Sequence, residues 1–362
     1  MSAGLDRAAR RSAGRVIAAL AARFRDLDLA EEAFSEACVA AARSWPTAED
    51  RLADDAQAIP DERLRLIFVC CHPAIAPDSR AALTLRLVCA LPAQEIAAAF
   101  LVPSSTLLQR LTRAKRKIAE ARVPFETPGP DGWAERLEAV LATLEIAYAK
   151  AHADATGAGP YAGFAGEVLH LTASLAEMLP AEGEVLGLAA LVRYAEARRP
   201  ARLDPRGRMV PLAEQDPALW SRPLIAAGDA FLHRAGNLGA YGPRALTAAI
   251  HGVWCARRGL ADPAPWADVL ALYDVMLAAR DDVVVRLNRA VAVAEVHGPA
   301  EALAELDGLA EPRLGDFQPW HAVRADLLRR LGRLDESRTA YDVAMRLAPG
   351  SAEREWLAER RP

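Results

Sequence analysis

Residues 92–122 read PAQEIAAAFLVPSSTLLQRLTRAKRKIAEAR, and this stretch combines a two-helix apolar pattern with a local excess of positive charge. Apolar residues spaced three or four positions apart keep one face of a helix on a core. Ile96, Ala97 and Phe100 have this spacing in a first segment. A second segment has it at Leu107, Leu108, Leu111, Ala114 and Ile118. The stretch therefore predicts two short helices that pack against a core.

A break separates the two predicted helices at Val102-Pro103-Ser104-Ser105. The residue before a proline avoids helical geometry, and a serine side chain can cap the helix that follows. We expect Ser104 or Ser105 to be the cap. Ser105, Thr106, Gln109 and Arg110 then lie in the first turns of the second helix, where a recognition helix contacts base edges.

The second predicted helix is strongly basic. Residues 104–122 hold six cations and one acid, a net charge of +5 in a chain whose net charge is −4. Cationic side chains beside phosphates give salt-sensitive, sequence-independent affinity for nucleic acid. The predicted DNA-binding residues are Ser104, Ser105, Thr106, Gln109, Arg110, Arg113, Lys115, Arg116 and Lys117. The alternative is a basic helix that is only a solvated surface.

The composition favours an all-α protein. The chain has 362 residues, of which 52% are hydrophobic, and alanine and leucine dominate over aromatic and β-branched residues. We find no run of eighteen apolar residues and no apolar signal core at the N-terminus, so we expect a cytoplasmic protein without membrane insertion.

The N-terminal segment, residues 1–45, predicts a helix pair with a break at residues 25–28. The expected apolar faces are Val16, Ile17, Leu20 and Phe24 in the first helix, and Leu29, Ala33, Phe34, Ala37 and Ala41 in the second. The second helix also carries Asp28, Glu31, Glu32 and Glu36 near its start. These acids suit the positive end of the helix dipole, and a protein-binding surface explains them equally well.

Three further segments follow the N-terminal pair. Residues 46–60 are acidic and bounded by prolines, which is typical of a linker. Residues 61–123 predict a compact helix-turn-helix DNA-binding domain. Residues 131–362 predict a long helical extension, broken at residues 198–223 by an arginine- and proline-rich stretch that we expect to be an ordered loop. Such a loop can hold a ligand or merely cap a helical array.

The end of the extension suggests a tetratricopeptide-like repeat. Leu331, Gly332, Arg333, Ser337, Tyr341, Ala344, Leu347 and Pro349 have its spacings. A weaker copy comprises Asn288, Ala292, Gly298, Ala302 and Leu306. Gly298 precedes Gly332 by 34 residues, which is the period of this repeat. Stacked helical hairpins are therefore expected in residues 268–362, as a site for a protein or small-molecule ligand.

Cysteine and histidine usage gives no sign of a metal, a cofactor or a catalytic residue. The five cysteines are irregularly spaced, and Cys70-Cys71-His72 lacks a second pair at zinc-finger spacing. We expect the cysteines to be buried, small apolar residues. The seven histidines are scattered, and no phosphate loop or catalytic motif is present, so we expect no enzyme.

Three stretches together resemble one family. They are IPDERLRLIFVCCHPAIAPDSRAALTLRLVCALPAQEIAAAFLVPSSTLLQRLTRAKRKI (59–118), DLDLAEEAFSEACVAAARSWP (26–46) and LVRYAEARRPARLDPRGRMVPLAEQDPALW (191–220). The chain resembles bacterial extracytoplasmic-function sigma factors of the subgroup with a long, tetratricopeptide-like helical C-terminal extension. The resemblance covers nearly the whole chain.

The resemblance implies two partners. The helix over residues 28–45 would dock on the clamp of the RNA polymerase β′ subunit, with the β flap as a further contact, and the helix over 105–122 would read the −35 promoter element. The implied polymerase-binding residues are Asp28, Glu31, Glu32, Phe34 and Glu36. Arg110, Arg113, Lys115 and Arg116 become contacts to double-stranded promoter DNA.

One departure from the family concerns the helix that captures the −10 element. Single-stranded DNA capture needs aromatic side chains beside cations. Residues 46–60 contain no aromatic residue and only one cation, Arg51, so this helix is missing from the pattern and residues 1–45 are a truncated core-binding pair. The sequence predicts a sigma-factor-family initiation protein. The alternatives are a sigma-derived DNA-binding regulator that does not melt promoters, and a helical-repeat interaction scaffold.

Overall fold

The computed structural model describes residues 3–44, 62–89, 91–100, 102–126, 130–153, 164–239, 241–309, 315–348 and 351–362. Within these ranges the secondary structure is helical, and the only β-type pairing is an isolated bridge between Leu203 and Met209. The predicted all-α class is confirmed. None of the described helices is long and apolar enough to cross a membrane.

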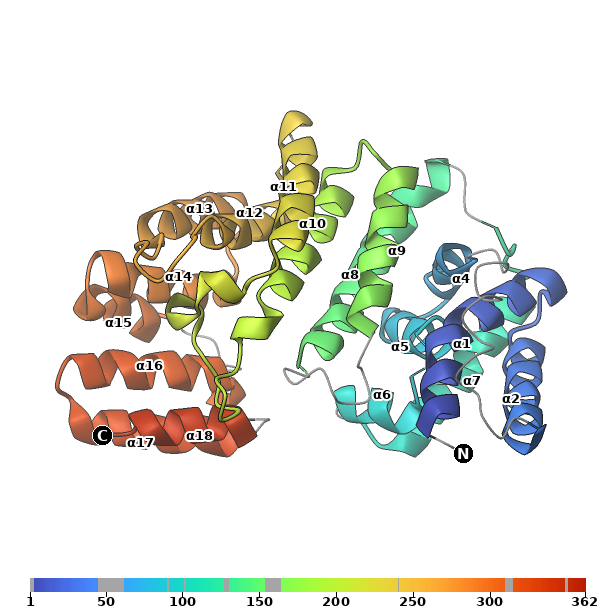
Figure 1. Cartoon of the computed structure of the whole chain (residues 1–362), viewed down its shortest axis with the longest axis horizontal. Coiled ribbons are helices and arrows are strands. Elements are labelled where there is room, and N and C mark those ends of the chain that lie inside the picture. The colour runs from blue at the N-terminus through green and yellow to red at the C-terminus, as the bar shows by residue number, and fades with distance from the viewer. Residues whose placement is uncertain are drawn as a thin grey trace. The chain divides into compact units, whose positions relative to one another are not determined.

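The chain divides into two compact units, residues 1–179 and 180–362. The first unit contains α1 (Ala3–Phe24), α2 (Leu27–Ser44), α4 (Arg63–Cys70), α5 (Pro77–Leu87), α6 (Ala93–Ala99), α7 (Ser104–Glu120), α8 (Pro130–Ala153) and α9 (Phe164–Met178) (Figure 1). This division differs from the expected one, in which the extension begins at residue 131. Helix α8 packs on α5, and Arg63 of α4 forms an ion pair with Glu167 of α9, so both helices belong to the first unit.

The core of the first unit is built around α4. Every residue from Leu66 to Cys71 has no measurable exposure, because α1, α5, α8 and α9 all contact this helix. Helix α8 contributes Val140, Leu141 and Leu144, all buried. A helix that is apolar all round is stable only when it is enclosed by others.

The break between α1 and α2 lies where the sequence predicts it. Arg25 has a positive φ of 56°, and the Asp26 carboxylate accepts hydrogen bonds from the backbone N–H groups of Asp28 (2.9 Å) and Leu29 (3.0 Å). This is the hydrogen bonding of an aspartate that caps a helix N-terminus.

The predicted apolar faces of α1 and α2 are wrong in part. Phe24 is 55% exposed and Leu29 is 44% exposed, and Ala37 is also exposed. Ile17 is buried as predicted, and the other buried residues include the small residues Ala18 and Ala21 on α1, and Leu27 and Ala30 on α2.

The second unit is a succession of packed helices. They are α10 (Gly183–Ala197), α11 (Arg222–Asn237), α12 (Pro243–Cys255), α13 (Trp266–Ala279), α14 (Val283–Val296), α15 (Pro299–Asp307), α16 (Gln318–Arg330), α17 (Leu334–Leu347) and α18 (Ser351–Arg360) (Figure 1). Each helix from α11 to α18 packs on the helix before it, and α10 packs on both α11 and α12. Tyr194 is fully buried, and its hydroxyl donates to Asp229 Oδ1 (2.7 Å).

The two candidate repeats occupy equivalent places in this succession. Gly298 (φ 102°) joins α14 to α15, and Gly332 (φ 76°) joins α16 to α17. Glycine is favoured at both turns because a positive φ strains other residues. Ser337 is buried and donates to the Ala325 carbonyl (2.8 Å), which links α17 to α16. This arrangement is consistent with stacked hairpins, and the tetratricopeptide-like assignment stays a prediction.

The loop between α10 and α11 is held by two arginines, Arg222 at the start of α11 and Arg257 just after α12. It contains three 3₁₀ turns, Arg199–Ala201, Leu212–Glu214 and Pro217–Leu219. Arg222 donates to the carbonyls of Pro217 and Arg257 (both 3.1 Å), and Arg257 donates to the Ala213 carbonyl (3.2 Å). These two guanidinium groups are therefore used to satisfy backbone carbonyls.

The predicted acidic linker, residues 46–60, lies outside the described residues, as does Trp45. The absence of the −10 helix therefore stays a prediction from the sequence.

Candidate nucleic-acid interface

The predicted helix-turn-helix is present as α6 and α7, which pack on each other and on α5. Its core side chains are buried as expected at Ile96, Ala97, Leu107, Leu111, Ala114 and Ile118. Leu108 was predicted to belong to this face and is 52% exposed instead. One residue corresponds to about 100° around a helix, so with Leu107 at the centre of the contact Leu108 points to the side.

The predicted serine cap is wrong. Helix α7 begins at Ser104, and Pro103 occupies the cap position with extended backbone angles (φ −58°, ψ 142°). The Pro103 carbonyl accepts the first helical hydrogen bond, from Leu107 N–H (3.1 Å). Proline suits this position because it is already fixed at a suitable φ, whereas both serines lie within the first turn.

The predicted DNA-binding residues occupy the solvent side of α7. Exposed side chains are Ser104, Ser105, Gln109, Arg113, Arg116 and Lys117, and half-buried ones are Thr106, Arg110 and Lys115. Thr106, Arg110, Arg113 and Lys117 follow a spacing of three or four and so form one stripe along the helix. Thr112 is also exposed between Gln109 and Arg116; the same spacing identifies it, although it was not among the predicted contacts.

Lys115 departs from this arrangement. Residues two positions apart on a helix point about 200° apart, so Lys115 faces away from the flank that carries Arg113 and Lys117. Its ammonium group is bound to α2, where it contacts Asp28 Oδ1 at 2.7 Å and also Glu31 Oε2. The second oxygen of Glu31 forms an ion pair with Arg86 Nε of α5 at 2.9 Å. This network therefore joins α2, α5 and α7.

The network changes the titration of Lys115. Partial burial of the ammonium group acts to lower its pKa, but the hydrogen bonds and negative charges of Asp28 and Glu31 outweigh that effect. The pKa of Lys115 is therefore raised above its ordinary value of 10.5. Lys115 is positively charged at neutral pH and serves an internal ion pair.

The predicted polymerase-binding residues divide into two groups. Glu32 and Glu36 are exposed on α2, and Phe34 is half-buried. The Asp28 and Glu31 carboxylates are both bound by Lys115, and the Glu31 side chain is only 15% exposed. Sequence reasoning missed Arg86 and the pairing with Lys115, because residues 55 or more positions apart leave no local signal.

The cysteines are all free. Cys70, Cys71 and Cys255 are buried as predicted, whereas Cys38 and Cys89 are half-buried. The Cys71 thiol lies 3.8 Å from the Thr143 hydroxyl and 4.0 Å from that of Thr84. Across the described part of the chain, no group of three or more His, Cys, Asp or Glu side chains is arranged to hold a metal ion.

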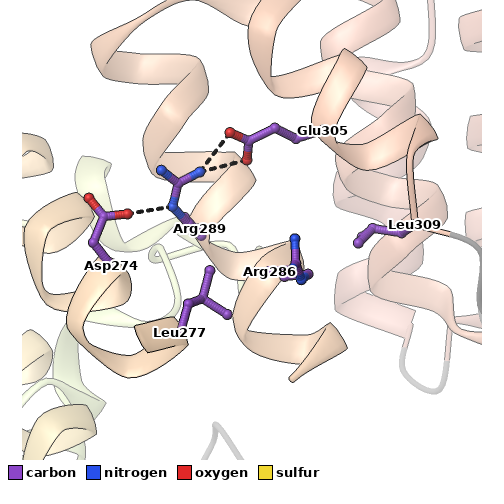
Figure 2. A pocket seen from close by; sticks show the side chains of 6 residues that line it. All are labelled: Asp274, Leu277, Arg286, Arg289, Glu305 and Leu309. Carbon is purple, nitrogen blue, oxygen red and sulfur yellow. Dashed lines mark hydrogen bonds and ion pairs between the residues drawn. The ribbon is translucent and has the colours of Figure 1, made fainter. Parts of the chain in front are cut away.

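A cavity of about 280 Å³ lies in the second unit, between α13, α14 and α15 (Figure 2). Arg289 lies at its centre, where it donates to Asp274 Oδ1 (2.7 Å) and to both Glu305 oxygens (2.6 and 2.7 Å). These hydrogen bonds raise the pKa of Arg289, with Glu305 the largest cause. The guanidinium charge is matched by two carboxylates, so its evident role is to connect three helices.

Comparisons with known proteins agree with this geometry. Residues 65–118, which span α4 to α7, match the family described as sigma-70, region 4. Residues 136–236 match a family of unknown function (DUF6596). The uncharacterized protein R00370 of Rhizobium meliloti (strain 1021) is 36% identical, over 92% of this chain and 89% of the relative. No solved structure matches the chain significantly.

The match to sigma-70, region 4 covers the α6–α7 pair and its supporting helices, and the basic side of α7 faces solvent. The identity to R00370 extends over nearly the whole length of both proteins. The chain therefore belongs to the same protein family as R00370 of Rhizobium meliloti and is a sigma-factor-like protein with a region 4 domain.

Proposed function

We propose that this protein binds double-stranded promoter DNA of the −35 type through α7 and acts with core RNA polymerase as a transcription initiation protein. The observation that carries the proposal is the solvent face of α7. It presents Arg113, Arg116 and Lys117, with Arg110 at its edge, on a helix whose opposite side is packed into a region 4 domain.

The face suits a duplex because its two ends differ chemically. Ser105, Thr106 and Gln109 lie in the first two turns, where side chains of a recognition helix reach base edges. Arg113, Arg116 and Lys117 lie further along, where they would contact phosphates. In this proposal the neutral residues supply sequence discrimination and the cations supply affinity.

Helix α2 is the proposed surface for polymerase. Glu32 and Glu36 are exposed there, and Val39 on the same helix is 50% exposed. An exposed apolar side chain next to acids is suited to a protein partner with basic and apolar residues. The β′ clamp is the proposed partner of α2, and the β flap a further contact.

DNA binding is tested by fluorescence anisotropy with a labelled promoter duplex over a series of salt concentrations. Replacement of both Arg113 and Arg116 by alanine should weaken binding by about 10- to 100-fold at low salt and reduce the salt slope by about 2. Arg346→Ala, an exposed arginine on α17, is the matched control and should bind like the wild type. Equal affinities for the double variant and the control would refute the assignment of α7.

A sigma-derived regulator that binds DNA without melting it is the second candidate. The observation in its favour is that residues 46–60 hold no aromatic side chain for −10 capture. Transcription in vitro with purified core polymerase separates the two candidates. Core-dependent open complexes support initiation, and DNA binding without open complexes supports the regulator.

The remaining proposals concern catalysis and cofactors, the location of the protein, and a ligand of the second unit. We propose a non-enzymatic protein that requires no metal or cofactor, and a cytoplasmic location. The helical array of the second unit is the proposed site for a protein or small-molecule ligand that adjusts activity.

A further inference from the structure

The ion-pair network at the start of α2 has a role beyond holding the fold. We propose that Asp28, Glu31 and Lys115 form an internal clasp that fixes α2 against α7 and has to open when α2 binds polymerase. The proposal rests on the assignment of α2 as the polymerase-binding helix. Its central observation is that α7, the DNA helix, holds two acids of α2, the polymerase helix.

Helix α2 is attached to the rest of the first unit by few buried side chains. Among its described side chains only Leu27 and Ala30 are buried, and both lie in the first turn. From Ser35 to Arg43 the side chains are exposed or half-buried. A segment with so few buried apolar contacts has low local stability. The charged hydrogen bonds of Asp28 and Glu31 therefore attach α2 to α7, in addition to the packing of α2 on α1.

Lys115 and a cationic partner would compete for the same acid on α2. Both Glu31 oxygens are engaged, one with Lys115 and one with Arg86, and the side chain is 15% exposed. A cationic side chain of a partner that takes the place of Lys115 on Glu31 opens the clasp. A partner that binds the open form more tightly shifts the protein toward it, and opening the clasp in advance raises the affinity for that partner.

The clasp and the DNA-binding residues lie on different sides of α7. Lys115 lies on the flank of α7 opposite Arg113 and Lys117, whose side chains stay exposed while the clasp is closed. The clasp therefore restricts access to Glu31 of α2 and leaves the DNA face of α7 open. The free protein is then able to bind duplex DNA before polymerase.

Hydrogen exchange of the full-length protein tests the clasp itself. Lys115→Met keeps the apolar stem and removes the charge, and Glu31→Gln removes the opposite charge. We expect amides of residues 27–44 to exchange about 10-fold faster in each variant. The effect in the double variant should be smaller than the two single effects combined, because both substitutions remove the Lys115–Glu31 pair. Lys117→Met, two positions away on the same helix, should leave this exchange unchanged. Unchanged exchange in Lys115→Met would overturn the clasp.

Affinity for core polymerase tests the coupling. Lys115→Met should bind core about 5-fold more tightly than the wild type, whereas Lys117→Met should match the wild type. Equal affinities of all three proteins would overturn the coupling. If neither the wild type nor any variant binds core polymerase, the polymerase assignment and the coupling are both refuted. The hydrogen-exchange result would still decide whether the clasp exists. DNA affinity should be the same for Lys115→Met and wild type, and a loss would show that Lys115 contacts DNA.

Discussion

Lys115 and Lys117 are the same residue type on the same helix, yet their surroundings differ completely. Lys117 is exposed, whereas the Lys115 side chain is 16% exposed and bound by two carboxylates. The difference follows from the 200° rotation between them and from α2 lying on only one side. Counting cations in the sequence therefore overestimates the charge available to DNA.

The raised pKa of Lys115 predicts a particular pH dependence of stability. A lysine whose pKa is higher in the folded state stabilises the fold fully below its ordinary value of 10.5 and loses that effect as the pH rises through the folded value. Lys115→Met should cost about 1–2 kcal/mol at neutral pH. The difference between the free energies of unfolding of the wild type and Lys115→Met should stay constant up to about pH 10 and become smaller above it.

Urea unfolding of the two proteins at several pH values measures this difference. Lys117→Met provides the control, since an exposed lysine should give a small difference that does not depend on pH. A difference for Lys115→Met that is unchanged well above pH 11 would contradict the prediction.

The thiols provide a second prediction at the residue scale. Burial raises the pKa values of Cys70, Cys71 and Cys89, and it raises that of Cys255 to about 11. Because the thiolate is the reactive form, these groups should react slowly with a thiol reagent at pH 8. The Cys38 thiol is less buried and should react first. Cys38→Ser should therefore remove the fast phase of the modification reaction. In denaturant all five cysteine thiols should react. Rapid modification of several native thiols would show that the first unit opens readily.

At the scale of elements, close helix contacts depend on small residues whose importance no local pattern reveals. Gly187 on α10 faces α12 so closely that a Cβ atom there would lie 2.5 Å from the Ala245 backbone nitrogen. Gly166 on α9 is also helical, and a Cβ atom there would meet nothing within 4 Å. The two glycines look alike in the sequence and differ only through packing.

Alanine substitution at these glycines should act in opposite directions. Gly187→Ala should destabilise the protein by about 2–3 kcal/mol, since one backbone has to move away from the other. Gly166→Ala should be neutral or stabilise by up to about 1 kcal/mol, because alanine favours a helix. Thermal unfolding measures both, and similar effects at the two sites would contradict the α10–α12 packing.

At the scale of the whole molecule, the second unit closes on itself. Arg208 of the loop before α11 pairs with Glu359 of α18 (3.2 Å), and Arg360 of α18 pairs with Glu214 of the same loop (3.1 Å). About 150 residues separate the partners, so the loop covers the end of the helical succession. The predicted capping role of this loop agrees with these contacts, and a ligand role stays a prediction.

The closure predicts that α18 matters more for its apolar contacts than for its charges. Glu359→Ala removes an exposed ion pair and should cost less than about 1 kcal/mol. Removal of residues 351–362 takes away the buried Leu357, should cost about 2–5 kcal/mol and should speed hydrogen exchange in residues 202–216. Unchanged exchange in that loop after the truncation would contradict the closure.

The sequence by itself determined the all-α class, the helix-turn-helix and most of its buried face, because these depend on the spacing of apolar residues along one helix. It also marked the turns at Gly298 and Gly332. Only the tertiary structure decided that Leu108, Phe24 and Leu29 face solvent, that α8 and α9 belong with the first unit, and that Lys115 binds α2. The physical reason is that periodicity fixes which residues share a face, whereas the partner of each face is chosen by contacts between segments far apart in the chain.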